Sequence, residues 1–348
     1  MNAPFQYYAY LREPTLDVMR IDHSPRDGTI LNHDCFYALL SGESGAFYNI
    51  MRALPAPSHK DMSMNFGAYR GNEDLNAAGT LVFPFREHPA LESFRQIHSN
   101  DSVIYAGDTF RFEVDTHEFH WTDANGRIDV HATRLGQMHE LYVPTQEGFP
   151  GPIVWQDHMA KMTGTIDGDP VEGIFHDSHI YGRPEFTFHD MAFTTRLENY
   201  WLDWLVEYDD GTLEGGWAMQ GHREAPYTVA HHVVDGVSTT RSDARMSISR
   251  NEQGNMQQAT LRHGRDLEIV LDQHGSFDRP IHTYGTVSSI SHPDKTVAKS
   301  WNYTENWPRN WGAVERYQMA SADLYGRFPS LKGILEPSRW ENEYLVFD

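Results

Sequence analysis

Residues 162–185 (MTGTIDGDPVEGIFHDSHIYGRPE) constrain the fold more than any other stretch of the sequence. Two short strand-like runs, 163–166 and 170–173, flank the turn 167–169, which reads Asp-Gly-Asp. An Asp-Gly dipeptide between two such runs is the strongest local indication of a β-hairpin. The sequence therefore predicts an antiparallel hairpin here, in a chain where long helical periodicity is scarce.

A run of polar side chains follows this hairpin and supplies the main functional candidates. His176, Asp177, Ser178, His179 and Tyr181 lie between two glycines. A purely structural strand would carry alternating Val, Thr and Tyr instead. Histidine and carboxylate groups are the usual proton-transfer groups of enzymes. We therefore predict that both histidines and Asp177 are catalytic, and that Ser178 and Tyr181 bind substrate at the mouth of a barrel.

The whole sequence has the pattern of an all-β protein. Aromatic residues make up 13% of the chain, and short aromatic or β-branched runs alternate with turn signals about every ten residues. A length of 348 residues suits two domains, each with its own core. We predict two tandem antiparallel β-barrel domains, 1–188 and 189–348, with little helix.

Some segments have a less regular pattern. Residues 147–158 are rich in turn formers and are expected to connect the barrels. Residues 87–99 fit either a helical turn or a loop. Residues 186–196 and 200–208 are expected strands, and 312–319 is expected to be the last long strand.

The charge balance limits the partners. Lys and Arg number 28 and Asp and Glu number 49, so the net charge is 28 − 49 = −21. This argues against nucleic acid and anionic membranes, because phosphate binding depends on clustered basic residues. Cys35 is the only cysteine, which favours a reducing compartment. Neither a secretory signal nor an apolar run of about 20 residues is visible, so we expect a soluble, cytoplasmic protein without membrane insertion. The sequence leaves undecided whether the chain forms a homodimer.

The run 164–182 resembles a signature of the carotenoid hydratase (hydroxyneurosporene synthase)-like, or AttH-like, superfamily of tandem lipocalin-fold proteins. That signature has a Gly-Thr hairpin and then a polar run that ends in Asp-His/Arg-x-Trp-Gly. His176 falls on a commonly basic position and His179 on the His/Arg position. The closing run 311–315 (WGAVE) also resembles the Gly-x-x-Glu ending of such domains. Four glycines fall on the glycines of the family: Gly164, Gly168, Gly173 and Gly182. The resemblance implies two lipocalin-like β-barrels.

The sequence departs from the family signature at two positions. Ser178 occupies the position of the family's Asp, and Tyr181 that of its Trp. The Asp is a candidate proton donor where the family hydrates alkenes, so the departure puts that chemistry in doubt. Asp177 is the neighbour that could substitute, but its side chain is expected on the opposite face of the strand.

A second candidate group lies on the predicted strand 200–208. Trp201 and Asp203 share one face of that strand, since alternate residues point the same way. This pair resembles an aromatic-x-Asp element that family members place opposite the polar run. An aromatic face stabilises developing positive charge, and Asp203 is a candidate to give or take the proton. The alternative is a purely structural role, in which the Trp201 ring packs in a core and Asp203 faces solvent. Trp217 is a further substrate-binding candidate.

The 20 histidines raise the question of a metal. The visible clusters are residues 117–120, 139–140 and 231–232. Residues that are adjacent or three apart on a strand point to opposite faces, so none of these clusters forms an easy chelate. No Gly-x-Ser-x-Gly, Walker loop or strand-linked Gly-x-Gly-x-x-Gly motif is present. We therefore expect neither a metal nor a cofactor.

Three kinds of function fit these observations. The first is a cofactor-independent lyase or isomerase, of hydratase or dehydratase type, that transfers protons on a hydrophobic terpenoid- or steroid-like molecule in a barrel pocket. The second is a pericyclase or cyclase of the same fold. The third is a non-catalytic carrier of a hydrophobic ligand, and a His-ligated metalloenzyme ranks below these. An acid–base enzyme needs two titratable groups within reach of one substrate atom, whereas a carrier does not.

Overall fold

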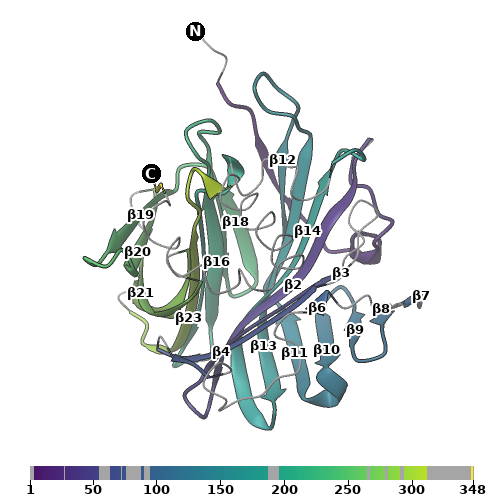
Figure 1. Ribbon diagram of the computed structural model, residues 1–348, viewed down its shortest axis with the longest axis vertical. Helices are drawn as coiled ribbons and strands as arrows, with labels where there is room; N and C mark the ends of the chain where they lie inside the picture. The colour runs from purple at the N-terminus through teal and green to yellow at the C-terminus, as the bar shows by residue number, and fades with distance from the viewer. Residues whose placement is uncertain are drawn as a thin grey trace, which may run out of the picture.

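The protein is an all-β chain in this computed structural model (Figure 1). Two antiparallel sheets follow one another along the sequence, which confirms the predicted all-β fold with two tandem antiparallel units. No helix within the described ranges is long and apolar enough to cross a membrane. The structure describes residues 4–26, 28–54, 63–71, 73–75, 88–89, 95–186, 196–264, 267–278, 281–290, 294–311 and 346–347.

The first sheet contains 14 strands. Its hydrogen-bonded order is β5-β4-β3-β2-β14-β13-β11-β10-β9-β8-β7, with β12 paired to β13 and β1, and β6 paired to β4. Two short 3-10 helices, η1 (Leu16–Met19) and η2 (Ala124–Gly126), lie between its strands. The strands are β1 (Tyr8–Arg12), β2 (Ile30–Gly42), β3 (Phe47–Leu54), β4 (Ser63–Arg70), β5 (Glu73–Asp74), β6 (His88–Pro89), β7 (Arg95–His98), β8 (Val103–Ala106), β9 (Arg111–Val114), β10 (Glu118–Asp123), β11 (Ile128–Arg134), β12 (Met138–Val143), β13 (Ile153–Ile166) and β14 (Asp169–Gly182).

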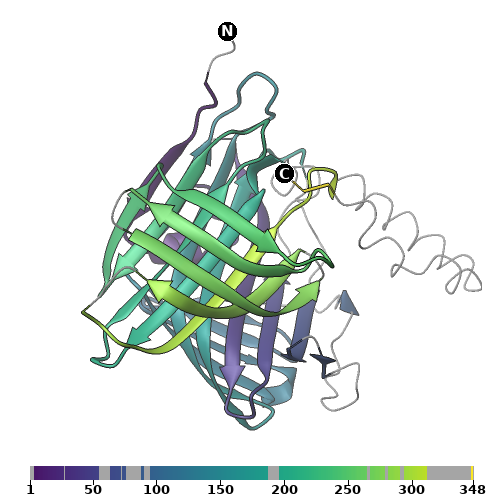
Figure 2. The same cartoon turned by 90° about the vertical axis from the view of Figure 1, so that its left-hand side faces the viewer.

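The second sheet contains nine strands in the order β18-β17-β16-β15-β23-β22-β21-β20-β19. Both sheets are strongly curled, and Figure 2 shows the second sheet in front of the first. The strands are β15 (Tyr200–Tyr208), β16 (Leu213–Gln220), β17 (Thr228–Val234), β18 (Val237–Arg241), β19 (Arg245–Arg250), β20 (Met256–His263), β21 (Leu267–Asp278), β22 (His282–Ile290) and β23 (Val297–Asn306).

The predicted hairpin is the connection between β13 and β14. Asp167 and Gly168 both have positive φ, 53° and 83°, as a two-residue turn of type I′ requires. Each strand runs for 14 residues, so the hairpin is much longer than the sequence indicated. Gly173 is needed where β14 meets β2, because a Cβ there would lie 2.1 Å from the carbonyl oxygen of Leu39.

Two expectations about local structure were wrong. Residues 153–158 do not connect two barrels but form the first half of β13, because the Gly and Pro residues end at 152 and an apolar run follows. Residues 95–98, within the expected helical turn or loop, form β7, which pairs with β8. The strand predicted at 200–208 coincides with β15.

The domain boundary cannot be compared with the structure in the same way. The predicted boundary at 188/189 and most of the predicted strand 186–196 lie outside the described residues, as do 312–319. The strands of the first sheet end at Gly182 and those of the second begin at Tyr200. The boundaries 1–188 and 189–348 stay a prediction.

Among the described residues, the three largest hydrophobic cores lie inside the first sheet, inside the second sheet and between the two. Phe36 and Phe175 belong to the core inside the first sheet, and Trp204 to the core inside the second. Tyr37 and Trp201 belong to the core between the sheets. Adjacent residues of β2 thus face different cores, as the period of two in a strand requires. We call the two sides of the first sheet its interior face and its interface face.

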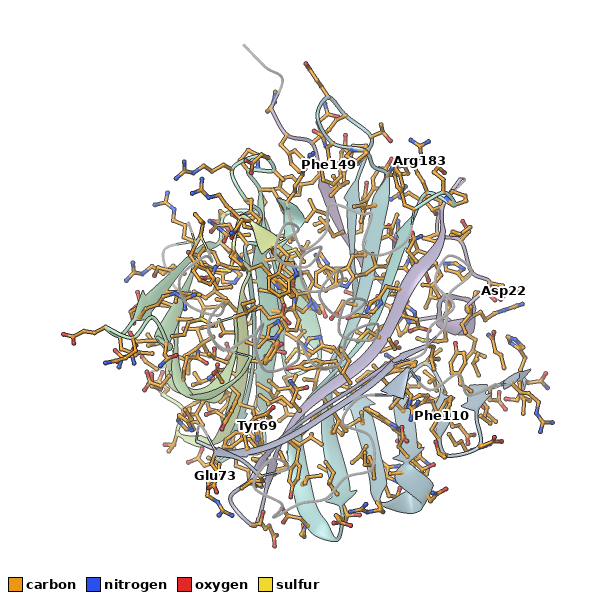
Figure 3. All side chains as sticks on the ribbon, viewed as in Figure 1. Asp22, Tyr69, Glu73, Phe110, Phe149 and Arg183 are labelled. Atoms are coloured by element: carbon orange, nitrogen blue, oxygen red, sulfur yellow. The ribbon has the colours of Figure 1, made fainter. Side chains whose placement is uncertain are left out.

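Aromatic contacts mark both faces in the side-chain view. Tyr69 of the first sheet contacts Tyr284 of the second, with ring centroids 6.3 Å apart, and Tyr69 is labelled in Figure 3. On the interior face, the Arg52 guanidinium lies 4.3 Å from the centre of the Phe110 ring. Arg52 also forms a buried ion pair of 2.6 Å with Asp123. The two faces of the first sheet are therefore both closely packed.

Candidate active site

Strand β14 divides the predicted site residues between the two faces of the first sheet. His176 contacts Asp203 of the second sheet, so His176 and Ser178 lie on the interface face. Asp177 and His179 contact each other on the interior face. The predicted separation of the two histidines is confirmed, but both lie within β14 and are at most 2% exposed. Their predicted position at a barrel mouth stays a prediction; β14 pairs with β13 and β2 along its length, and both side chains are buried.

The interface cluster consists of His176, Ser178, Asp157 and Asp203. The Nδ1 atom of His176 lies 2.8 Å from Asp157 Oδ1, and its Nε2 atom lies 3.0 Å from Asp203 Oδ2. The Ser178 hydroxyl donates a hydrogen bond to the other oxygen of Asp157. The backbone N–H of Tyr303 donates to Asp203 Oδ1 at 2.8 Å. One imidazole ring thus links a carboxylate of each sheet.

The two carboxylates determine the protonation of His176. Burial by itself lowers the pKa of His176, but Asp157 and then Asp203 outweigh burial and raise the pKa to about 10. Burial raises the pKa of Asp203 above its ordinary value, and His176 offsets part of that rise. The ring therefore carries a proton at neutral pH, beside a carboxylate that is more basic than usual. Groups of this kind can exchange a proton with a third partner.

Three aromatic rings surround the interface cluster. Trp201 lies edge-on to His176 with ring centroids 5.2 Å apart, and Tyr37 lies 6.2 Å from His176. Tyr303 closes the group at 4.9 Å from Tyr37 and 5.7 Å from Trp201. Tyr37 and Trp201 are 8% and 6% exposed, whereas Asp203 is fully buried. The rings therefore lie between the charged groups and the accessible side of the cluster.

Two polar atoms of this aromatic group have no hydrogen-bond partner among the described residues. They are the hydroxyl of Tyr37 and the indole Nε1 of Trp201. A buried donor without an acceptor is costly, by about 1–3 kcal/mol, and is rare in native proteins. An oxygen-bearing ligand would satisfy both donors.

The interior cluster consists of Asp177, His179, His158, Arg134 and Asp34. The Asp177 carboxylate lies 2.8 Å from His179 Nε2, 3.3 Å from Arg134 Nη2 and 3.6 Å from His158 Nδ1. The Nδ1 atom of His179 lies 3.4 Å from Asp34 Oδ1. All five side chains are at most 3% exposed. Asp177 therefore cannot reach a ligand held by the interface cluster, as its position on the strand predicted.

Burial and charge act in opposite directions within the interior cluster. Burial lowers the pKa of His179, but Asp177 and Asp34 outweigh burial and raise that pKa to about 9. Burial raises the pKa of Asp177, but His179, His158 and Arg134 hold it well below its ordinary value. Burial, with Arg134 nearby, lowers the pKa of His158 to about 4, and burial raises that of Asp34 to about 7. Asp177 is thus firmly ionised and His158 neutral.

The remaining predicted residues fall on different faces. Tyr181 lies on the interior side, with its ring 6.4 Å from that of His179, and therefore apart from Ser178. Trp217 is the residue of β16 directly opposite Asp203, and its ring packs 4.6 Å from Trp155 in the core between the sheets. Of the two, Trp217 adjoins the interface cluster and Tyr181 the interior cluster.

Sequence reasoning missed Asp157, His158, Asp34, Arg134 and Tyr37. For the first two a signal was available, because the turn at Asp167-Gly168 pairs Ile166 with Asp169 and so fixes the register of the whole hairpin. The other three reach the clusters from β2 and β11, and no local motif marks them.

Two groups of described residues have the spacing of metal ligands. His120, Asp129 and His131 form a partly exposed group on β10 and β11, in which the two histidine rings stack at 3.9 Å. The second group is buried and belongs to the interior cluster. Both are assembled across neighbouring strands, which is why adjacent positions in the sequence did not indicate them.

A hollow of about 380 Å³ opens beside the interior cluster. Arg134, His117, Gln137 and Ser238 are among the residues that line it. Arg134 also contacts Asp177, so its side chain separates this hollow from the buried carboxylate. None of the eight predicted site residues lines the hollow.

Comparison with known proteins gives structural neighbours only. No family model matches the sequence, and no curated protein matches it. A solved structure assigned as AttH from Nitrosomonas europaea is 12% identical over 79% of this chain and 92% of its own, with a TM-score of 0.37. Kievitone hydratase from Nectria haematococca is 6% identical over 80% and 89%, with a TM-score of 0.36.

Proposed function

We propose that this protein is a cofactor-independent lyase or isomerase that transfers protons on a hydrophobic, oxygen-bearing small molecule. The observation that carries the proposal is the placement of His176 between Asp157 and Asp203 beneath an aromatic group with two unpartnered donors. The substrate class, terpenoid- or steroid-like, follows from the apolar and aromatic surroundings of these groups.

The chemistry assigned to this cluster is the loss or gain of water at an alcohol or alkene. In the direction of water loss, the acid formed by His176 and Asp203 protonates the substrate hydroxyl, and the C–O bond breaks to release water. The cation that remains is stabilised by the face of Trp201. Asp203 or His176, now deprotonated, takes a proton from the neighbouring carbon, so the double bond forms and the acid is restored. Hydration is the same sequence reversed.

Asp157 and Ser178 have supporting roles in this proposal. Asp157 holds one nitrogen of His176 and so fixes the ring that faces Asp203. Ser178, in the position of the family's Asp, donates its hydrogen to Asp157 rather than to a ligand. The proton that the family signature would place on that Asp is therefore assigned here to His176 and Asp203.

A non-catalytic carrier is the second candidate, and one observation favours it. The charged groups are closed off, with His176 and Asp203 at most 1% exposed. A ligand held by Tyr37 and Trp201 alone would need no proton transfer. A carrier and an enzyme differ in what happens to the ligand after it binds, so a binding assay and a turnover assay on the same variants separate them.

The test uses terpenoid and steroid alcohols, with loss or gain of water followed by mass change. Asp203→Asn keeps the size of the side chain but removes its acid. Glu214→Gln is the matched control, because Glu214 is equally buried but lies in the interior of the second sheet. Loss of turnover with retained binding in Asp203→Asn, and not in Glu214→Gln, supports the enzyme. Binding without any mass change in the parent protein establishes the carrier instead.

A further inference from the structure

The interior cluster contains three ligand-type side chains that the proposed reaction does not use. His158 on β13 and Asp177 on β14 are directly opposite each other, and His179 is two positions further along β14 on the same face. One ligand atom of each lies within 4.8 Å of the others, and all three residues are buried. A register fixed by the hairpin turn thus brings two imidazoles and one carboxylate to one point inside the first sheet.

His158 is the residue of this group whose hydrogen-bonding capacity is least satisfied. Its Nε2 atom has no hydrogen-bond partner among the described residues, its Nδ1 atom has only the long contact of 3.6 Å with Asp177, and the residue is 2% exposed. A buried ring nitrogen without a partner loses its free energy of hydration. An unsatisfied buried polar atom in a native protein calls for an explanation, and a bound ion is one of the recognised explanations.

The distances within the group suit a small ion. The contacts of Asp177 with His179 Nε2 and His158 Nδ1 measure 2.8 and 3.6 Å. Ligand atoms in a tetrahedral site with bonds of about 2.0–2.1 Å lie roughly 3.3 Å from one another. The nitrogens of His158 and His179 lie within 4.8 Å of each other, so the three side chains need to close by at most about 1.5 Å to share one ion.

The residues around the three ligands match the surroundings of metal sites. Asp34 lies 3.4 Å from His179 Nδ1, the nitrogen that points away from Asp177. A carboxylate in that place fixes the tautomer that leaves the other nitrogen free for a metal. Arg134 contacts the second oxygen of Asp177 at 3.3 Å and holds the carboxylate in orientation. With neutral histidines, the two Asp and one Arg sum to −1, so a cation is favoured.

We propose that His158, Asp177 and His179 bind one divalent transition-metal ion of the Zn²⁺ type. Two imidazoles with one carboxylate select zinc and similar ions over calcium and magnesium, which prefer oxygen ligands. Three protein ligands leave a further coordination position open. The hollow lined by Arg134 leads to the site only if the Arg134 side chain moves aside, because Arg134 separates the hollow from Asp177. The site is separate from the interface cluster, since β14 itself lies between the two.

The alternative is that a proton takes the place of the metal, with His179 charged and paired to both carboxylates. Titration with Co²⁺ and Zn²⁺ separates the two possibilities. The purified protein is stripped with a chelator and dialysed, and binding is followed by Co²⁺ absorption and by calorimetry. We expect one Co²⁺ per chain with the spectrum of a nitrogen- and oxygen-bound ion, displaced by one equivalent of Zn²⁺.

Two variants make the test specific. His158→Gln is expected to weaken binding at least 100-fold, whereas His131→Ala, in the exposed group, is expected to leave it unchanged. The thermal unfolding midpoint of each stripped protein shows whether the variant folds, and added Zn²⁺ raises it in the parent but not in His158→Gln. The proposal is overturned if the parent protein binds no Co²⁺ at about 100 µM. It is also overturned if His131→Ala abolishes binding and His158→Gln does not.

Discussion

The two faces of β14 carry clusters of similar composition but opposite electrostatic design. On the interface face, His176 lies between two carboxylates from different sheets, and no described Arg or Lys forms an ion pair with either carboxylate. On the interior face, Asp177 lies among two histidines and Arg134, all from one sheet. The first cluster has an excess of proton acceptors around one proton donor. The second surrounds Asp177 with Arg134 and two imidazoles, and its other carboxylate, Asp34, contacts His179.

This difference determines what each cluster can do. Where two carboxylates contact one imidazolium, the proton has acceptors on both sides of the ring and can be passed on. Where Arg134 and His179 both stabilise Asp177, its charge is fixed, and the site suits a bound ion or a structural role. The comparison teaches that the face of the strand, rather than the types of residue, separates a candidate proton-transfer site from a candidate cation site.

The largest expected effect is on turnover at the interface face. Asp203→Asn removes the carboxyl group that shares the proton of His176, and a general acid–base group is typically worth ~10²–10⁴-fold in rate. We expect the loss in kcat rather than in KM, measured on a substrate found in the alcohol panel. If Asp203→Asn keeps full turnover and a metal chelator abolishes it, the reaction takes place at the interior cluster instead.

The next effect is on stability, and it should be larger on the interior face. Asp177→Asn leaves Arg134 buried without its carboxylate and His179 with Asp34 alone, and breaking a buried pair in this way costs about 3–5 kcal/mol. Asp203→Asn leaves His176 its second partner, Asp157, and should cost less. Urea unfolding of the two variants at neutral pH measures the difference. Equal losses would mean that the two clusters are not electrostatically different.

In the protein stripped of metal by a chelator, the dependence of stability on pH compares the two histidines directly. The pKa of His176 is raised to about 10 and that of His179 to about 9, both above the ordinary value of 6.5. A raised pKa means that the folded state holds the proton more tightly, so its stabilisation is complete below pH 6.5 and is lost as pH rises to 9–10. Each histidine contributes a slope of up to about 1.4 kcal/mol per pH unit in this window.

The slope can be assigned by substitution. His176→Gln and His179→Gln should each flatten the fall of the unfolding midpoint between pH 6.5 and 10, and the fall should end about one pH unit earlier when only His179 remains. Thermal unfolding followed by circular dichroism across this range is the measurement. An unchanged slope in both variants contradicts the protonated state assigned to the two rings.

The smallest effects concern the neighbours of the interface cluster. Trp201→Leu should lower kcat by about tenfold if positive charge develops beside the ring, because a cation–π contact is worth roughly 1–2 kcal/mol. Ser178→Ala removes one hydrogen bond to Asp157, worth about 1 kcal/mol of stability, and should change turnover less than Trp201→Leu does. A larger loss of turnover in Ser178→Ala would mean that Ser178 handles the proton itself.

The sequence by itself determined the strands, the turn and the faces. The Asp167-Gly168 turn predicts the hairpin, and the period of two in a strand separates His176 from His179 and joins Trp201 to Asp203. These are local properties, because backbone geometry fixes them whatever the rest of the chain does. The same turn also fixes which residues of β13 lie opposite β14, so the neighbours of the polar run could have been found by counting back along the hairpin.

Only the tertiary structure decided which charges meet. Asp203 reaches His176 because the second sheet packs on the interface face of the first, and Asp34 and Arg134 reach His179 and Asp177 because β2 and β11 belong to the same curled sheet. Such contacts join residues far apart in the chain. Strand patterns state which face is buried but not what covers it, so partners that depend on sheet order and curvature are fixed only when the sheets close on each other.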